Sequence, residues 1–203
     1  MKRQPTFVVV GLGVLLAFTS SPAGVQPGIP AGFKVEVFAE NLGRARFMAF
    51  GPDPSASLGA GGVLYVTAIG TGTVLVLPDR NKDGKADSVI TFADGLRAPH
   101  GLAWRQVHRR DAGATAGVTE GWLYVGETHQ VVRLRDTDGA LRADAREVVV
   151  PDLPPDEMHF TSTVGFGPDG GLYVSVGSSC NVCEDEPRRA AILGFNAYAP
   201  TVS

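Results

Sequence analysis

The chain has 203 residues, of which 44% are hydrophobic and 19% charged, and its formal net charge is −3. This balance is that of an ordinary globular protein without electrostatic attraction for nucleic acid, so we expect no nucleic-acid partner. The 26 glycines and 14 prolines are spread along the chain, which is typical of an all-β protein with many short segments and tight turns.

Residues 1–23 have the pattern of a secretory signal peptide. Lys2 and Arg3 precede an apolar run over residues 7–18, and small residues follow up to Ala23. The run is too short to span a bilayer comfortably, which favours a removed signal over an uncleaved anchor, the alternative. We therefore expect cleavage after Ala23, a linker over residues 24–30, a folded domain over residues 31–203, a periplasmic or secreted location and no stable membrane span.

The folded part repeats one pattern three times. The motif G-x-L-Y-V begins at Gly62, Gly121 and Gly170. Each copy follows a short apolar strand ("RFMAF", "HGLAW", "STVGF") and precedes another β-rich run ("TVLVLPD", "VVRLRD", "AAILGFN"). The units recur about every fifty to sixty residues, which is the size of a propeller blade. The alternative is an antiparallel sandwich whose strands are similar by chance.

About three such units fit in the chain, whereas propellers close with about four to eight blades. The sequence therefore predicts an all-β fold, a partial six-bladed β-propeller of about three blades. We interpret the chain as a truncated product or as a fragment that needs partner copies, with an open sheet edge at its end.

One loop, Asp79–Asp87, has acidic or amide side chains at alternate positions, as calcium loops do. It lacks the terminal glutamate of an EF-hand, and a DG hairpin turn explains it without metal; both interpretations stay open. The second copy of this loop, at Asp136 and Asp138, is a poorer match.

Cys180 and Cys183 are the only cysteines. Two thiols cannot complete a zinc site. In an exported protein a local disulfide is the simplest interpretation, with free or catalytic thiols as the alternative.

Several stretches resemble a known family. "RAPHGLAWR", "GWLYVGETHQVVRLRDTDG" and "MHFTSTVGFGPDGGLYVSVGSSCNVCEDEPRRAAI" are similar to the N-terminal half of the glucose/sorbosone dehydrogenases, which are six-bladed quinoprotein propellers that use pyrroloquinoline quinone (PQQ). The resemblance implies an oxidoreductase with PQQ and calcium as cofactors, a sugar or aldose substrate and an external electron acceptor. It also implies that His159, just before the GPD turn, is the general base.

The repeat places three further residues with this histidine. When the units are registered by Phe50, Trp104 and Phe166, the residues Arg46, His100 and Ser162 occupy one equivalent position. We predict these three as cofactor-binding residues near one mouth of the channel, and we predict no metal ligand among them. Many relatives of the sorbosone type have an arginine where Ser162 stands, and its loss would weaken the binding of the quinone carboxylates.

The turns that follow the G-x-L-Y-V strands return to the same mouth, so Glu127, His129 and Asn181 are candidates for its polar rim. The loop 105–120, with His108, is expected at the opposite end. Because the family's other cofactor ligands come from later blades, this chain is expected to be inactive by itself.

Two alternative functions stay open from the sequence. One is a non-catalytic propeller of the cell envelope that recognises a ligand or a protein. The other, a lactone hydrolase, requires a metal site of Glu, Asn and Asp side chains on the channel axis, for which Glu127 and Asn181 alone are insufficient.

Overall fold

The computed structural model of the chain describes residues 28–53, 62–106, 121–154 and 158–195. The chain consists of two compact units with the boundary after Val35, and all the described strands belong to the unit that begins at Glu36. The predicted signal peptide and most of the predicted linker lie outside the described residues. Within the described part, no helix is long and apolar enough to cross a membrane.

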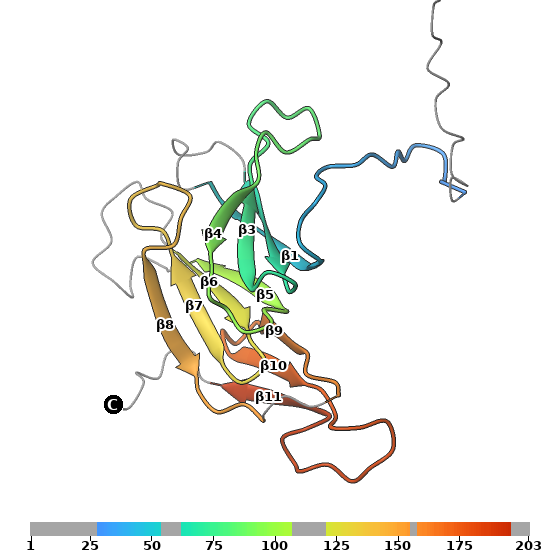
Figure 1. The fold of residues 1–203 in the computed structure, drawn as a ribbon, viewed down its shortest axis with the longest axis vertical. Helices are drawn as coiled ribbons and strands as arrows, with labels where there is room; N and C mark the ends of the chain where they lie inside the picture. Colours follow the sequence, from blue (N-terminus) through green and yellow to red (C-terminus); the bar gives the residue numbers. More distant parts are fainter. Residues whose placement is uncertain (1–27, 54–61, 107–120, 155–157, 196–203) are drawn as a thin grey trace, which may run out of the picture. The chain divides into compact units, whose positions relative to one another are not determined.

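The described strands form three separate antiparallel sheets, each built from consecutive strands (Figure 1). The first sheet, blade 1, consists of β1 (Ala45–Pro52), β2 (Gly62–Ala68), β3 (Thr73–Leu77) and β4 (Ile90–Ala93). The second, blade 2, consists of β5 (Leu102–Gln106), β6 (Gly121–Gly126), β7 (Val131–Arg135) and β8 (Ala145–Val150). The third, blade 3, consists of β9 (Ser162–Phe166), β10 (Leu172–Val176) and β11 (Ala191–Phe195).

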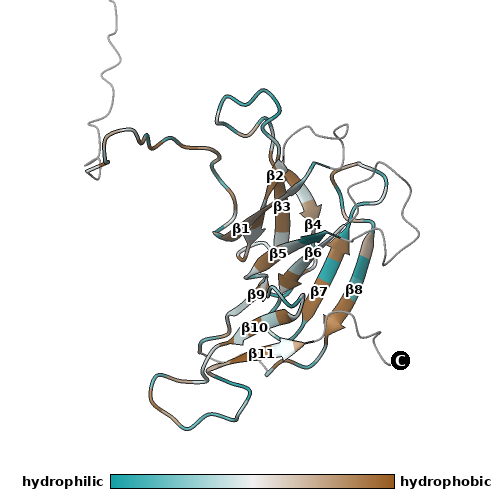
Figure 2. Cartoon of the chain, turned by 180° about the vertical axis from the view of Figure 1, so that it is seen from behind, coloured by the Kyte–Doolittle hydropathy of each residue, from teal (hydrophilic) through white to brown (hydrophobic). Residues whose placement is uncertain are grey.

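The burial of the central strands follows from the order of the blades. Every residue of β6 is buried, because blade 2 has a neighbouring blade on each face. In β10 the leucine and valines are buried and the residues between them are not, because the described residues cover only one face of blade 3. Figure 2 shows the hydropathy along the chain: hydrophobic residues are concentrated in the strands, whereas the loop between β3 and β4 is largely hydrophilic.

Two hydrophobic cores hold the blades together. Between blades 1 and 2, the ring of Tyr65 stacks on Trp104 at 6.1 Å and meets the edge of Phe92 at 5.0 Å. Between blades 2 and 3, Tyr124 meets Phe166 edge-on at 4.8 Å. Aromatic pairs of this kind contribute about 0.5–1.5 kcal/mol each beyond the apolar area that they bury.

A third cluster lies on the other face of blade 1. There the segment of Phe38, Ala39 and Leu42 packs on β2 and β3, and the carbonyl of Phe38 accepts a hydrogen bond from the N–H of Ala86 at 2.9 Å. The stretch before β1 thus covers part of a sheet face.

The arrangement confirms the predicted fold. Three consecutive sheets pack face to face, with the first strands β1, β5 and β9 in contact from blade to blade. Two-sheet sandwich packing does not have this pattern, so that alternative is wrong. The starts of β1, β5 and β9 therefore lie on one side of the three blades. The predicted residues Arg46, His100 and Ser162 lie at or next to these strand starts.

Candidate functional site

The starts of the first strands are joined by hydrogen bonds that cross from blade to blade. The N–H of Gly101 donates to the carbonyl of Ser162 at 2.9 Å, which links blade 2 to blade 3. On the other side, the hydroxyl of Thr67 donates to the carbonyl of His100 at 2.7 Å, which links blade 1 to blade 2. These bonds hold Ser162 next to blade 2 and His100 next to blade 1.

Arg46 and His100, from different blades, are in direct contact. The Nε–H of Arg46 donates to Nε2 of His100 at 3.0 Å. Because Nε2 accepts, the neutral ring of His100 carries its proton on Nδ1. Burial, and then the positive charge of Arg46, lower the pKa of His100 from 6.5 to about 4. The imidazole is therefore neutral at physiological pH.

The same pair leaves polar groups for a ligand or for a neighbouring group. His100 is only 4% exposed, and its Nδ1 is buried without a hydrogen-bond partner among the described residues. Arg46 lies at the exposed end of β1, and within the described part its terminal Nη groups form no hydrogen bond of their own. A guanidinium in this position can bind a carboxylate through two parallel hydrogen bonds.

The repeat register is right at the aromatic positions and wrong by one residue at Arg46. Phe50, Trp104 and Phe166 do face the leucines of the three G-x-L-Y-V motifs. In blade 1, however, Ala45 rather than Arg46 pairs with Ala68, because the register shifts between Ala45 and Met48. This β-bulge places both Arg46 and Phe47 opposite Thr67, and it directs Arg46 toward His100.

Ser162 is the first residue of β9 and is 2% exposed. It contributes its carbonyl to the contact with Gly101. A side chain at Gly126 would lie 2.5 Å from that carbonyl, so blades 2 and 3 meet here with no space for a Cβ atom. Ser162 thus lies next to Gly101, the residue after His100, and it contributes to the site through its backbone.

His159, the predicted general base, lies beside the loop that follows β10. Its Nδ1 is 2.9 Å from the Oγ of Ser178, and its backbone is so close to Gly177 that a Cβ there would overlap the carbonyl of His159. Since Val176, the last residue of β10, pairs with Ser162, His159 is near the start of β9. Its side chain is partly accessible to solvent.

The loop that contacts His159 is closed by a disulfide between Cys180 and Cys183, as predicted. Asp185 closes the same loop, because it accepts hydrogen bonds from the N–H and the hydroxyl of Ser179. These hydrogen bonds hold the pKa of Asp185 below its usual value. Two local closures therefore shape the segment that carries Ser178.

Glu127, a candidate for the polar rim, is instead a buried anchor. Its carboxylate is 1% exposed and accepts from the N–H of Arg97 at 2.5 Å, from Nε2 of Gln130 at 2.6 Å and from Arg146 at 3.3 Å. The connection from blade 1 to His100 is thereby fixed to blade 2. Of the other rim candidates, His129 is half-buried and Asn181 is exposed. His108, predicted at the opposite end of the channel, lies outside the described residues.

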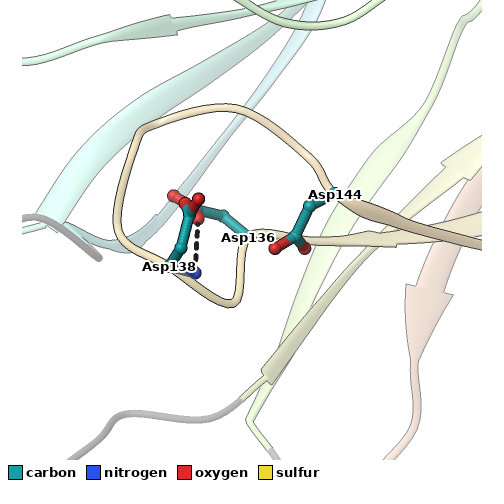
Figure 3. Close-up of side chains that lie close together, drawn as sticks. All are labelled: Asp136, Asp138 and Asp144. Atoms are coloured by element: carbon teal, nitrogen blue, oxygen red, sulfur yellow. Dashed lines mark hydrogen bonds between the residues drawn. The ribbon is translucent and has the colours of Figure 1, made fainter.

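The two acidic loops use their carboxylates mainly to hold their own turns. In the first loop Asp79 accepts from the N–H groups of Asp83 and Gly84. In the second, Asp136, Asp138 and Asp144 come close together (Figure 3). The oxygens of Asp136 accept three backbone N–H groups, those of Asp138, Gly139 and Leu141. In the second loop, which was the poorer match to a calcium loop in sequence, three carboxylates thus lie close together.

Thr67 and Ser178 are the site residues that the sequence reasoning missed. A signal for Thr67 exists: it directly follows its G-x-L-Y-V motif, as Ser175 follows the third copy. Both hydroxyls accept a hydrogen bond from an N–H of the first strand of their own blade, that of Phe47 or Thr163. Ser178 has no such repeat signal, because its role depends on where the preceding loop places His159.

The comparisons with known proteins agree with this architecture. Residues 60–194 match the model of a family described as a domain of unknown function, DUF7133. No curated protein matches the chain. Three similar solved structures share less than 25% identity with the chain, so they show the fold alone.

A calcium structure of a Trichoderma reesei carbohydrate-active enzyme of family AA12 has a TM-score of 0.59 and 21% identity, over 81% of this chain and 38% of that one. The PQQ domain of a pyranose dehydrogenase from Coprinopsis cinerea, in its holo form, has a TM-score of 0.50 and 17% identity, over 71% and 30%. A Thermus thermophilus protein, provisionally described as an oxidoreductase (glucose dehydrogenase), has a TM-score of 0.53 and 24% identity, over 84% and 50%. The chain thus spans half or less of each of these structures.

Proposed function

We propose that this chain, which belongs to the DUF7133 family, forms three blades of a PQQ-dependent dehydrogenase that oxidises a sugar or an aldose. The observation that supports the proposal most is the contact between Arg46 and His100 at the starts of two adjacent first strands. It provides a cation and a neutral imidazole at one place in a fold shared with a PQQ domain. Similarity of the fold alone would not support a dehydrogenase function, because one fold hosts many functions.

The described residues fit part of a quinone that carries three carboxylates. The Nη groups of Arg46 suit one carboxylate, and the buried Nδ1–H of His100 is a donor without a partner in the described part of the chain. Ser162 offers no charge, so additional cations must come from elsewhere. When bound, the quinone would accept hydride from the substrate carbon.

His159 is proposed as the base that removes the proton from the substrate hydroxyl. If Nδ1–H donates to the Oγ of Ser178 across their 2.9 Å contact, then Nε2 carries the lone pair that the reaction needs. Ser178 would thus fix the tautomer and the orientation of the ring. The side chain is partly accessible, so a substrate can approach it.

Calcium is proposed as a second cofactor of the complete propeller, held by ligands outside the described site. Among the described residues near the strand starts, the buried carboxylate is that of Glu127, and it already accepts hydrogen bonds from Arg97, Gln130 and Arg146. The acidic cluster of Figure 3 lies in the loop that joins β7 to β8, not at the starts of the first strands.

The location and the electron acceptor belong to the same proposal. Cleavage of residues 1–23 would deliver the protein to the periplasm or outside the cell, where the Cys180–Cys183 disulfide is stable. Reduced quinone would then pass its electrons to an external acceptor. N-terminal sequencing of the exported protein tests this part, and an intact Met1 would contradict it.

Quinone binding by the longest natural form of the protein is the direct test, because the matched structures are longer than this chain and further cations are expected from outside it. We expect PQQ to quench the fluorescence of Trp104 and Trp122, and Arg46→Ala to weaken its binding about tenfold or more, as for a lost charge-assisted pair. Arg142→Ala is the matched control, since it removes an exposed guanidinium from the loop between β7 and β8. Equal affinity of the two variants would contradict the placement of the quinone.

The dehydrogenase activity itself is tested on the longest natural form of the protein, supplied with PQQ and calcium. Reduction of a dye by a panel of sugars and aldoses is expected, and His159→Ala should lower the turnover about a hundredfold or more without changing quinone affinity. Quinone binding without any dye reduction would favour a non-catalytic propeller instead.

A further inference from the structure

The buried hydroxyl of Thr67 lies between the two residues of the Arg46–His100 pair. Thr67 is the second-last residue of β2 and has no exposed surface. Its Oγ1 accepts a hydrogen bond from the N–H of Phe47 at 3.0 Å and donates to the carbonyl of His100 at 2.7 Å. One hydroxyl therefore joins β1 of its own blade to the start of β5 in the next.

The hydroxyl of Thr67 lies beside the bulge in β1. Two residues, Arg46 and Phe47, oppose the single residue Thr67. A bulge of this kind takes a residue out of the regular ladder, and its backbone N–H then needs another partner. The side chain of Thr67 provides that partner for Phe47, so it stabilises the local backbone geometry from which Arg46 extends.

Three contacts between blades 1 and 2 depend on this geometry. Besides the hydroxyl bond to the His100 carbonyl, the ring of Phe47 lies 4.6 Å from the imidazole, at 49° to it. The guanidinium of Arg46 holds Nε2 of the same ring at 3.0 Å. Residues 46 and 47 thus both contact the imidazole of His100, while the hydroxyl of Thr67 bonds to the backbone of Phe47 and of His100.

We infer that Thr67 is the positioning residue of the site: its hydroxyl sets the bulge that directs Arg46 onto His100. Its effect on quinone binding rests on the proposed function, whereas the geometry of the Arg46–His100 pair does not. The role is one of positioning, since the buried hydroxyl is covered and does not reach a ligand.

The inference is tested by Thr67→Val, which replaces the hydroxyl by a methyl of similar size. Thr67→Ser keeps the hydroxyl and should restore the wild-type behaviour. Thr71→Val is the matched control, because Thr71 lies in the same hairpin, after β2, and among the described residues its hydroxyl forms hydrogen bonds with the Ala68 carbonyl and the Thr73 hydroxyl.

The first measurement is the NMR titration of the imidazole of His100. It should titrate near 4 in the unsubstituted chain, in Thr67→Ser and in Thr71→Val. In Thr67→Val the midpoint should rise toward 6.5, because the ring loses its burial when the contacts of residues 46 and 47 loosen. A midpoint that stays near 4 in folded Thr67→Val would overturn the inference.

The second measurement does not depend on a variant that folds. In the unsubstituted chain, the hydroxyl proton of Thr67 should exchange slowly with water, because it is buried and bonded to the His100 carbonyl. Rapid exchange would contradict the inference as well.

The affinity for PQQ then separates this inference from the proposed function. Thr67→Val should bind the quinone about tenfold more weakly than Thr71→Val. If the unsubstituted protein in its longest natural form binds no quinone, the proposed function fails, while the titration still decides the role of Thr67. If it binds quinone and Thr67→Val binds it equally well, the positioning role fails.

Discussion

Replacing Gly101 by alanine should separate blades 2 and 3 at the candidate site. A Cβ atom at Gly101 would lie 2.5 Å from the Cα of Thr163, 2.8 Å from the N of Val164 and 2.9 Å from the carbonyl oxygen of Ser162. All three atoms belong to the backbone, so no side chain can rotate away. The first distance is 0.9 Å short of the 3.4 Å at which ordinary contact begins.

The cost can be worked out from two terms. Overpacking in a closely packed interior costs about 1–3 kcal/mol. A shift that relieves the overlap also lengthens the hydrogen bond from Gly101 to the Ser162 carbonyl, now 2.9 Å, and the loss of such a bond costs about 1 kcal/mol. We therefore expect Gly101→Ala to lower the free energy of unfolding by about 2–4 kcal/mol.

Urea denaturation followed by tryptophan fluorescence measures this loss, because Trp104 and Trp122 lie in the cores between the blades. Gly165→Ala is the matched control: Gly165 is in β9, two residues after Thr163, and its Cβ would meet nothing within 4 Å. It should leave stability unchanged or raise it slightly, since glycine weakens a strand. If the two variants are equally stable, the close approach of blades 2 and 3 at Gly101 is refuted.

Two further predictions concern buried polar groups. The unfolded chain takes up a proton on His100 near pH 6.5 and the folded chain only near pH 4, so stability should fall as the pH decreases across this interval, by about 1.4 kcal/mol per pH unit at most. The part of the slope due to His100 should disappear in His100→Gln, as measured by urea denaturation at several pH values, and an unchanged slope would exclude His100 as its source. Glu127→Ala should cost about 2–3 kcal/mol, because it leaves the N–H of Arg97 without its acceptor. Glu127→Gln keeps an acceptor oxygen and should cost less in thermal unfolding, so equal losses in both variants would contradict this reasoning.

The blades could be predicted from the sequence because their signals are local and repeated. In every blade the G-x-L-Y-V motif marks the beginning of the second strand, to within two residues. In β10, the alternation of leucine and valine with other residues marks the face that the blade buries. The Cys180–Cys183 disulfide could be predicted for the same reason, since the two cysteines are the only ones in the chain and lie three positions apart. Once the strands are located, each one pairs with the next strand in sequence within its blade.

The details of the site could be predicted less well, because they depend on single-residue irregularities. A bulge adds one residue to β1 without changing its hydrophobic pattern, so counting back from Phe50 gives the wrong partner for Ala68. The burial of Glu127 is another case: a glutamate in a turn is usually solvated, and only the structure brings Arg97, Gln130 and Arg146 around it. Sequence spacing indicates which residues are neighbours, but not which of them are covered.

The candidate site is a property of the contacts between blades rather than of any single blade. Arg46 comes from blade 1 and His100 from the start of blade 2, and neither has its partner without the other blade. The bonds that align them also cross these boundaries, from Thr67 to His100 and from Gly101 to Ser162. Because interiors of this kind are closely packed and transmit displacements, a substitution in the core of Tyr65 and Trp104 should disturb the Arg46–His100 pair although it touches neither residue. Stability and ligand affinity are therefore expected to change together for substitutions at these boundaries, and independently for those in the outer loops.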